Sequence, residues 1–126
     1  MPIERRHVGK RMSDIVTFVP AGDRLVWLAG QVAEDATADL PEQARSVLAQ
    51  IDRLLAEVGS DKRQIISATI YLPDINDFAA MNAVWDAWVP QGHTPARATV
   101  EAKLASPAYR IEIQVVAAMP AASVVN

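Results

Sequence analysis

The sequence has no cysteine and only two histidines. Without cysteine the chain cannot form a disulfide bond, a thiolate metal site or a cysteine nucleophile. His7 and His93 lie far apart and have no companions at metal-ligand spacing, so we expect no metal site. A G-x-S-x-G elbow, a P-loop and a G-x-G-x-x-G pattern are also missing. Covalent catalysis and nucleotide binding are therefore without support, and we expect no cofactor.

The sequence also lacks an excess of positive charge and a long apolar run. Twelve Lys and Arg residues stand against 15 Asp and Glu residues, a formal charge of −3, so we do not expect nucleic acid as a partner. The one basic segment, RRHVGKR at residues 5–11, is interpreted as a solvated arm or edge strand. No apolar run approaches the ~20 residues that span a bilayer, and the N-terminus lacks the apolar region of a signal peptide. We expect a cytoplasmic protein without membrane contact.

The length and composition are those of one folded domain, residues 1–126. Half of the residues (51%) are hydrophobic and 21% are charged, which suits a chain that buries a single core. No internal repeat is present. The ending PAASVVN, residues 120–126, is expected to be loosely held.

Two helices are predicted. The first begins at a capping box of Asp39 and Glu42, tolerates Pro41 in its first turn and stops at Gly59. Its apolar residues recur at helical spacing: Ala44, Val47, Leu48, Ile51, Leu54, Leu55 and Val58. The second helix follows a cap at Asp74 and ends at Pro90, with one apolar face: Phe78, Met81, Trp85 and Trp88. Such an aromatic stripe is typical of a core.

Strands account for most of the remaining chain. Segments 14–19 and 24–31 flank the turn-like PAGD and predict a hairpin. Segment 64–72, rich in β-branched residues, joins the two helices. Segments 94–104 and 109–117 flank the short ASPA connection and predict a second hairpin. The order ββαβαββ, with room for an extra N-terminal strand, indicates an α+β domain with both helices on one face of the sheet.

The second face of this sheet should be polar in a monomer. It is instead half apolar: the segment RLVWLAG has apolar residues in both alternations, and Ser67, Thr69, Tyr71 and Thr99 are small or amphipathic. Burial against further copies of the chain would explain this pattern, so we expect a homo-oligomer.

Arg97 raises the question of function. In TPARATVEAKL it lies on the polar alternation of a strand, where it could be a solvated side chain or the binding group for an anion. Glu112 lies on the corresponding alternation of YRIEIQVVA. A simple hairpin would pair Thr99 with Gln114 and leave Arg97 roughly 13 Å from Glu112, too far for an ion pair but within reach of one small ligand. Because a guanidinium can bind a carboxylate through two hydrogen bonds, an unpaired arginine suits a carboxylate ligand.

Several segments resemble one known family. They are AGQVAED, EQARSVLAQIDRLLAEVGSDKRQI, SATIYLPDINDFAAMNAVWDAW, PARATVEAKL and IEIQVVAA. Together they resemble the RidA/YjgF reactive-intermediate deaminases over about residues 10–118. The resemblance implies a chorismate-mutase-like α+β fold that assembles as a homotrimer, with sites in clefts between subunits. It also implies hydrolysis of enamines and imines, such as 2-aminoacrylate, to 2-keto acids and ammonia without a cofactor.

The resemblance also implies roles for particular residues. Arg97, in the PAR segment, would bind the carboxylate of a small-molecule substrate, and Glu112, in the IEI segment, would serve the attacking water. Asn82 matches a frequent family asparagine. Gly30 is interpreted as a close-approach backbone position near the ligand.

Three positions depart from the family pattern. Thr99 stands where a cysteine is often found two residues after the arginine, and it would line the substrate site. Ala29 replaces a serine, and Met12 replaces a tyrosine near the N-terminal strand. These changes should reshape the pocket while leaving the carboxylate clamp and the acid/base group in place.

Three other functions remain open. A carboxylate-binding regulatory module could use Arg97 without catalysis. An RNA-directed activity would need more positive charge than this sequence has. A mutase acting on a dicarboxylate would need more than one basic residue in the cleft. The sequence does not name the substrate's side chain.

Overall fold

The computed structural model describes residues 2–22 and 24–120, and the ending predicted to be loose lies, from residue 121 on, outside this range. The strands are β1 (Ile3–Val8), β2 (Ser13–Phe18), β3 (Arg24–Trp27), β4 (Ile65–Leu72), β5 (Ala96–Glu101) and β6 (Glu112–Met119). The α-helices are α1 (Leu40–Glu57) and α2 (Phe78–Trp88), and short 3₁₀ turns cover Lys62–Gln64 and Ile75–Asp77. No helix of the described residues is both long and apolar enough to cross a membrane.

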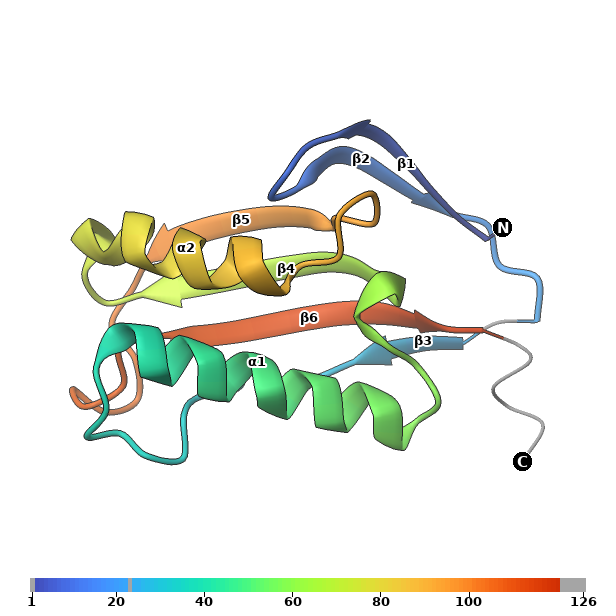
Figure 1. Cartoon of the computed structure of the whole chain (residues 1–126). Helices are drawn as coiled ribbons and strands as arrows, with labels where there is room; N and C mark the ends of the chain where they lie inside the picture. The colour runs from blue at the N-terminus through green and yellow to red at the C-terminus, as the bar shows by residue number, and fades with distance from the viewer. Residues whose placement is uncertain (1, 23, 121–126) are drawn as a thin grey trace.

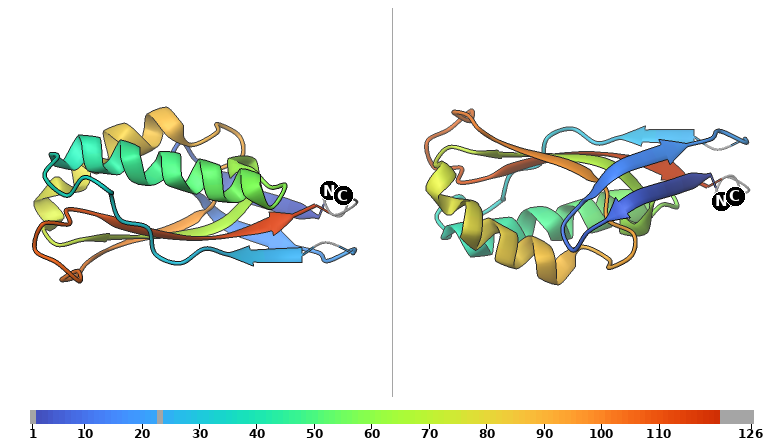
Figure 2. Two further views of the ribbon diagram at one scale, coloured as in Figure 1. Left: turned by 90° about the horizontal axis from the view of Figure 1, so that it is seen from below. Right: turned by 90° about the horizontal axis from the view of Figure 1, so that it is seen from above.

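The strands form two sheets. The larger has the order β3-β6-β4-β5, in which β4 and β5 are parallel and the other neighbours antiparallel. The smaller pairs β1 with β2. Both helices lie on one face of the larger sheet, and its other face carries none of the described helices (Figures 1 and 2). The predicted α+β architecture, with a mixed sheet and two helices on one face, is confirmed.

Both predicted hairpins are wrong. β2 pairs with β1, the extra N-terminal strand, and β3 pairs with β6 in the other sheet. β5 does not pair with β6 at all, because β6 lies between β3 and β4 while β5 adds to the far edge of β4. The helical connection between β4 and β5 is what permits their parallel pairing, since parallel neighbours need a long crossover. Nearness in sequence was therefore a poor guide to strand partners here.

The basic segment 5–11 forms most of β1 and the turn that follows, and Arg5 is not simply solvated. Its guanidinium donates to the carbonyl oxygens of Thr94 at 2.8 Å, Ile65 at 3.1 Å and Arg63 at 2.6 Å. These bonds fix the edge strand β1 to the start of β4 and to the segment before β5. The edge-strand interpretation is confirmed, but this arginine is structural.

The helices follow most of their predicted signals, but Phe78 and Val58, which were expected in the apolar stripes, are exposed. The Asp39 carboxylate caps α1 by accepting from the Glu42 N–H at 3.0 Å, and Gly59 follows the helix with φ of 77°. The reciprocal half of the capping box is replaced, because the Glu42 side chain pairs with Arg45. Asp74 caps the 3₁₀ turn that precedes α2 rather than α2 itself.

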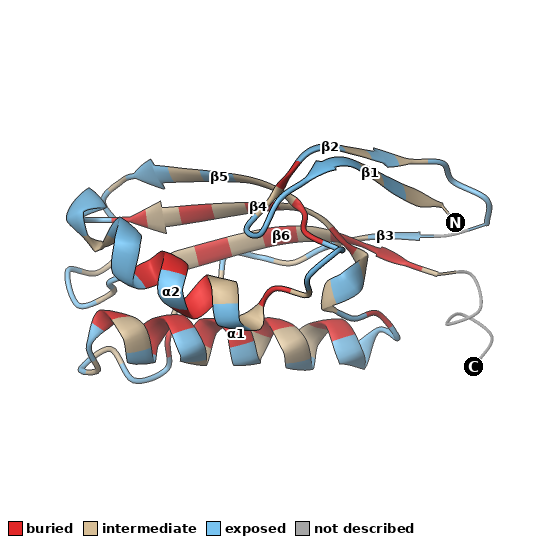
Figure 3. Cartoon of the chain, turned by 45° about the horizontal axis from the view of Figure 1, so that its top comes forward, coloured by how far each residue is buried: buried red, intermediate tan, exposed pale blue. Residues whose placement is uncertain are grey.

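The core lies between the helices and the covered sheet face (Figure 3). α1 contributes Val47, Ile51 and Leu55, α2 contributes Met81 and Trp85, β4 contributes Ala68, Ile70 and Leu72, and β6 contributes Ile113, Val115 and Ala117. Each of these strand residues alternates with one on the uncovered face, so the register decides on which face a polar side chain lies.

The uncovered face carries large apolar side chains. Trp27 is 63% exposed, and Leu25 and Val100 are also exposed. Trp27 pairs with Val116 and Val100 with Tyr71, so these side chains share one surface across the sheet. An exposed tryptophan within such a surface is typical of an interface between chains. Burial of this face in an oligomer stays a prediction.

Candidate active site

Arg97 lies on the covered face, not on the open one. It pairs in register with the buried Ala68, and its guanidinium carbon is 5.2 Å from the centre of the Trp85 ring. Nη1 lies 3.9 Å from the Met81 sulfur, a weak acceptor. The solvated alternative for Arg97 is therefore excluded, because the side chain is half-buried between β5 and α2.

No carboxylate of the described residues pairs with Arg97, although other arginines of the chain do have such partners. Burial lowers the pKa of Arg97 to about 10, the positive charge of Arg11 acts in the same direction, and Asp86 opposes both. Such a shift means that the charged form is poorly compensated in this structure. A bound anion would supply the missing compensation.

Three buried polar atoms have no hydrogen-bond partner among the described residues: Asn82 Oδ1, Arg97 Nε and Thr99 Oγ1. Asn82 is only 2% exposed and follows Met81 on α2, and Thr99 is two residues beyond Arg97 on the same face of β5. An unsatisfied buried polar atom costs about 1–3 kcal/mol, so such atoms are expected to have partners. Three of the predicted ligand-binding residues thus each carry a buried polar atom without a partner among the described residues.

The turn between β1 and β2 lies against the same tryptophan. The Trp85 indole N–H donates to the Arg11 carbonyl at 2.9 Å, and Arg11 Nε donates to both Asp86 oxygens, at 3.0 and 3.2 Å. Met12, the residue that departs from the family pattern, is the next in this turn and is half-buried. The sequence analysis did not predict that Arg11 contacts Trp85 and Asp86, although it noted the basic segment that contains Arg11.

Glu112 lies on the open face of the sheet, opposite to Arg97. It begins β6 and pairs in register with Tyr71, which projects from the open face. The segment that carries Gly30 runs antiparallel beside β6: Leu28 N–H donates to Val115 O at 3.1 Å and Gln31 N–H to Ile113 O at 2.8 Å. A Cβ at Gly30 would overlap Glu112 Oε2 and lie 2.8 Å from its Cδ. The predicted close approach at Gly30 is therefore an approach to the Glu112 carboxylate.

Arg97 and Glu112 consequently cannot share a ligand within one chain. Strand β4 lies between them, and Ala68, the partner of Arg97, points to the face opposite to Tyr71, the partner of Glu112. The expectation that the two side chains lean toward one ligand across a hairpin was wrong. It failed because it assumed that β5 and β6 are neighbours.

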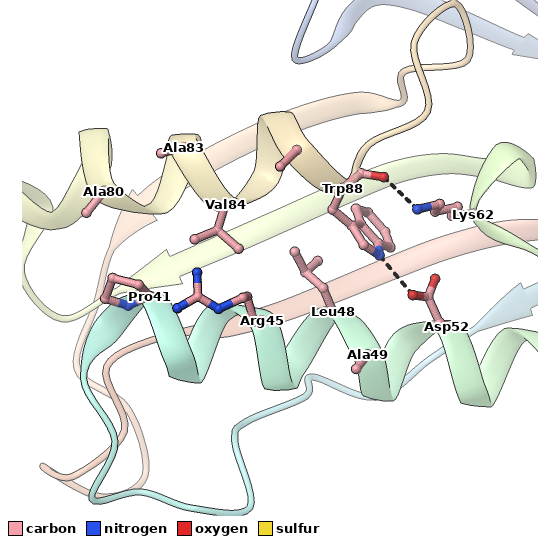
Figure 4. A pocket seen from close by; sticks show the side chains of 11 residues that line it. Pro41, Arg45, Leu48, Ala49, Asp52, Lys62, Ala80, Ala83, Val84 and Trp88 are labelled. Carbon is pink, nitrogen blue, oxygen red and sulfur yellow. Dashed lines mark hydrogen bonds between the residues drawn. The ribbon is translucent and has the colours of Figure 1, made fainter.

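A groove between α1 and α2, with a volume of about 620 Å³, is a third location (Figure 4). Small side chains of α2, Ala80, Ala83 and Ala87, leave it open. Its polar groups already have partners: Lys62 donates to the Trp88 carbonyl at 2.7 Å, and the Trp88 indole donates to Asp52 at 3.0 Å. None of the predicted site residues lines this groove, so it adds nothing to the candidate site.

Comparisons with known proteins agree with the fold and with the segments noted above. Residues 9–119 match the family described as Endoribonuclease L-PSP. The chain is 47% identical to the RutC family protein YoaB of Escherichia coli strain K12, over 94% of this chain and 100% of that protein. It is 30% identical to the 2-iminobutanoate/2-iminopropanoate deaminase of Rattus norvegicus, over 75% of this chain and 73% of the rat protein.

A solved structure extends the comparison to three dimensions. NMB1025 of Neisseria meningitidis, described as a member of the YjgF protein family, is 48% identical, with a TM-score of 0.74 over 95% of this chain and 97% of that one. Sequence and fold therefore agree over nearly the whole length, and the chain belongs to the YjgF/RidA family.

Proposed function

We propose that this protein hydrolyses reactive 2-imino and enamine acids to 2-keto acids and ammonia, as a cytoplasmic homotrimer. The observation that carries the proposal is Arg97, a half-buried guanidinium without a carboxylate partner among the described residues. A substrate carboxylate fits this position because it would satisfy the charge and offer acceptors to unpaired donors. The names of the rat and goat relatives, both 2-iminobutanoate/2-iminopropanoate deaminases, support the reaction type.

The site is proposed to form between two copies of the chain. Arg97 of one copy would bind the substrate's carboxylate, and Glu112 of a neighbouring copy would approach from its own open sheet face. The exposed apolar surface around Trp27 is the surface that such an assembly would bury. A closed ring of identical copies repeats the same Arg97-to-Glu112 contact at each interface.

The proposed chemistry needs few groups. Binding at Arg97 holds the imine carbon beside a fixed carboxylate, which orients it for attack without a metal. Water adds to this carbon, a C–O bond forms, and the C=N π electrons move to nitrogen, which takes a proton. The C–N bond then breaks and the oxygen loses its proton, so that one imine and one water give one keto acid and one ammonia. Glu112 would accept the water's proton and return it to the leaving nitrogen.

A second function is favoured by one specific observation. Asn82, Arg97 and Thr99 of a single chain carry unsatisfied buried polar atoms, and Glu112 lies on the other face of the sheet. A regulatory module that binds a carboxylate metabolite would need only this set. Such a module would bind keto acids but would not accelerate imine hydrolysis.

Turnover separates the two functions. The imine is generated in place by an amino acid oxidase, and keto acid or ammonia release is followed with and without the protein, after subtraction of the buffer rate. A deaminase accelerates release in proportion to protein concentration. Binding of a keto acid without any acceleration would support the module and refute the deaminase.

A further inference from the structure

A second arginine lies at the site of Arg97, and the proposed reaction does not use it. Trp85 connects the two: its ring lies under the Arg97 guanidinium, and its indole N–H holds the Arg11 carbonyl at 2.9 Å. The β1–β2 turn that carries Arg11 is anchored further, because the Ser13 hydroxyl donates to the Thr94 carbonyl at 2.7 Å, and Thr94 lies three residues before Arg97. The two arginines therefore both contact Trp85, Arg97 through its guanidinium and Arg11 through its backbone carbonyl.

Positive charge exceeds negative charge in this cluster. Arg11 pairs with Asp86, and Lys10 Nζ lies 4.0 Å from the same carboxylate. Arg97 adds a third cation without a carboxylate partner of its own among the described residues. Lys10, Arg11 and Arg97 around Asp86 leave a formal excess of two positive charges, and Asp14, which lines the hollow beside Arg11, reduces this excess to one. The repulsion is felt at Arg97, where the charge of Arg11 helps to lower the pKa.

Arg11 can still bind a ligand. Arg11 donates to Asp86 from Nε, so its terminal Nη groups take no part in these two hydrogen bonds. The Arg11 side chain is 44% exposed. A hollow of about 440 Å³ borders it and includes His7, Met12 and Asp14 among its lining residues. No ion pair joins Asp14 to Arg11 in the described part of the chain. A guanidinium in this state can offer two parallel N–H groups to a carboxylate.

We propose that Arg11 binds a second carboxylate at the far end of the substrate, so that the preferred substrates are 2-imino dicarboxylic acids, the imines of acidic amino acids. This inference rests on the proposed function, because it assigns the substrate class of the same site. Arg97 takes the carboxylate beside the imine carbon and Arg11 takes the distal one. The second carboxylate of such a ligand would add negative charge where the cluster has an excess of positive charge.

Binding of the keto acid products tests the inference without depending on catalysis. Calorimetry with 2-oxoglutarate and with 2-oxobutanoate, which carry two carboxylates and one, should give at least ~10-fold tighter binding of the diacid, the size expected for one charged hydrogen-bonded contact. Arg11→Met should reduce this ratio to near one. Equal binding of the two ligands by the wild type, or a ratio that Arg11→Met leaves intact, overturns the inference.

Two further variants test whether the diacid preference comes from Arg11 itself or from the overall positive charge of the chain. Arg6→Met removes one positive charge from an exposed position of β1 and should keep the diacid preference. Arg11→Lys keeps a charge but loses the paired donors, so an intermediate ratio is expected, and it serves if Arg11→Met does not fold. A preference lost equally in Arg6→Met would reduce the effect to overall charge and overturn the role of Arg11.

Turnover assays distinguish failure of the proposed deaminase function from failure of the proposed role of Arg11. Diacid selectivity in binding, without hydrolysis of any imine, refutes the proposed deaminase function and leaves the role of Arg11 standing. Hydrolysis of monocarboxylic imines as fast as dicarboxylic ones supports the deaminase and overturns the role of Arg11.

Discussion

Arg97 and Glu112 project from opposite faces of one sheet, with strand β4 between them. A single chain therefore holds the two halves of the proposed site apart. A ring of copies would bring Arg97 of one chain toward Glu112 of the next. This relationship gives a direct test of whether the site is shared.

Mixed oligomers provide that test. Arg97→Ala and Glu112→Gln chains should each be inactive alone, but unfolding and refolding them together creates interfaces with Arg97 from one chain and Glu112 from the other. Random 1:1 mixing should restore about a quarter of the wild-type sites. The measurement is imine hydrolysis per mole of chain, with separately refolded variants combined afterwards as the control. No recovery after co-refolding, with mixed oligomers present, would refute a site that takes Arg97 from one chain and Glu112 from another.

The sequence predicted the elements that depend on local signals. The Asp39 cap and the Gly59 stop fixed α1, and the apolar stripe of α2 identified Met81 and Trp85 as core. These signals act within a few residues of the chain, so they can be read without knowledge of the partners. The alternation of side chains in β5 was also read correctly.

Strand partners and faces could not be read in the same way. Alternation places Arg97 opposite to Ala98 but does not tell which of the two meets the helices. In β5 the covered side carries Arg97 and Thr99, while Ala98 and Val100 lie exposed on the open face. Because the apolar side of β5 faces away from the core, its sequence pattern suggests the wrong face for Arg97. The pattern is understood only if the open face is also buried, in an interface between chains. The contact between the Trp85 ring and the Arg97 guanidinium could be seen only in the structure, where α2 packs against β5.

Arg97→Met should leave the unliganded protein at least as stable as the wild type. Methionine keeps apolar contact with Trp85 and removes a poorly compensated charge. Because the folded-state pKa of about 10 lies below the ordinary value of arginine, the charged form weakens folding at all pH values below about 10, and this cost fades as pH rises further. Urea unfolding at pH 7 measures the comparison. A marked loss of stability in Arg97→Met would indicate a structural role for the guanidinium.

With a carboxylate ligand bound, the wild type should become more stable than Arg97→Met. A saturating 2-keto acid should raise the melting temperature of the wild type, because it binds the folded state only, and should leave Arg97→Met unchanged. Thermal unfolding with and without the keto acid gives the result. A primary alcohol of similar size is the control, since it lacks the charge that Arg97 would bind.

Glu112→Gln should separate binding from chemistry. Glutamine keeps the shape and hydrogen bonding of the side chain but not its basicity, so pyruvate should still bind while imine turnover falls at least ~100-fold, the lower end for loss of general acid–base catalysis. Calorimetry and initial rates, corrected for the buffer reaction, provide the two measurements. If Glu112→Gln turns over imines at the wild-type rate, the residue is not catalytic and a carboxylate-binding module becomes the better description.

Gly30→Ala should act on the Glu112 carboxylate. The added Cβ would overlap Oε2, and the flexible end of Glu112 can move aside, so we expect a stable protein with impaired turnover and retained keto acid binding. The matched control is Gly92→Ala, where a Cβ meets nothing within 4 Å but the backbone has φ of 84°. That control should lose about 1 kcal/mol of stability or somewhat more, with no specific effect on chemistry. Equal turnover in Gly30→Ala and the wild type would separate Glu112 from the reaction.

The open sheet face supplies the last prediction. Trp27, Leu25 and Val100 expose apolar surface on one side of the sheet, and water contact with such a surface is unfavourable by roughly 25 cal/mol per Å². Light scattering should therefore give about three times the chain mass of 13.7 kDa. Trp27→Asp places a charge where the copies would meet, and it should shift the mass toward the monomer and abolish turnover together. Ile75→Asp is the control, because Ile75 is also an exposed apolar residue but lies in the 3₁₀ turn before α2. A wild-type protein that stays monomeric at all concentrations would remove the basis for a shared site, since nothing would then bring a second chain's Glu112 to Arg97.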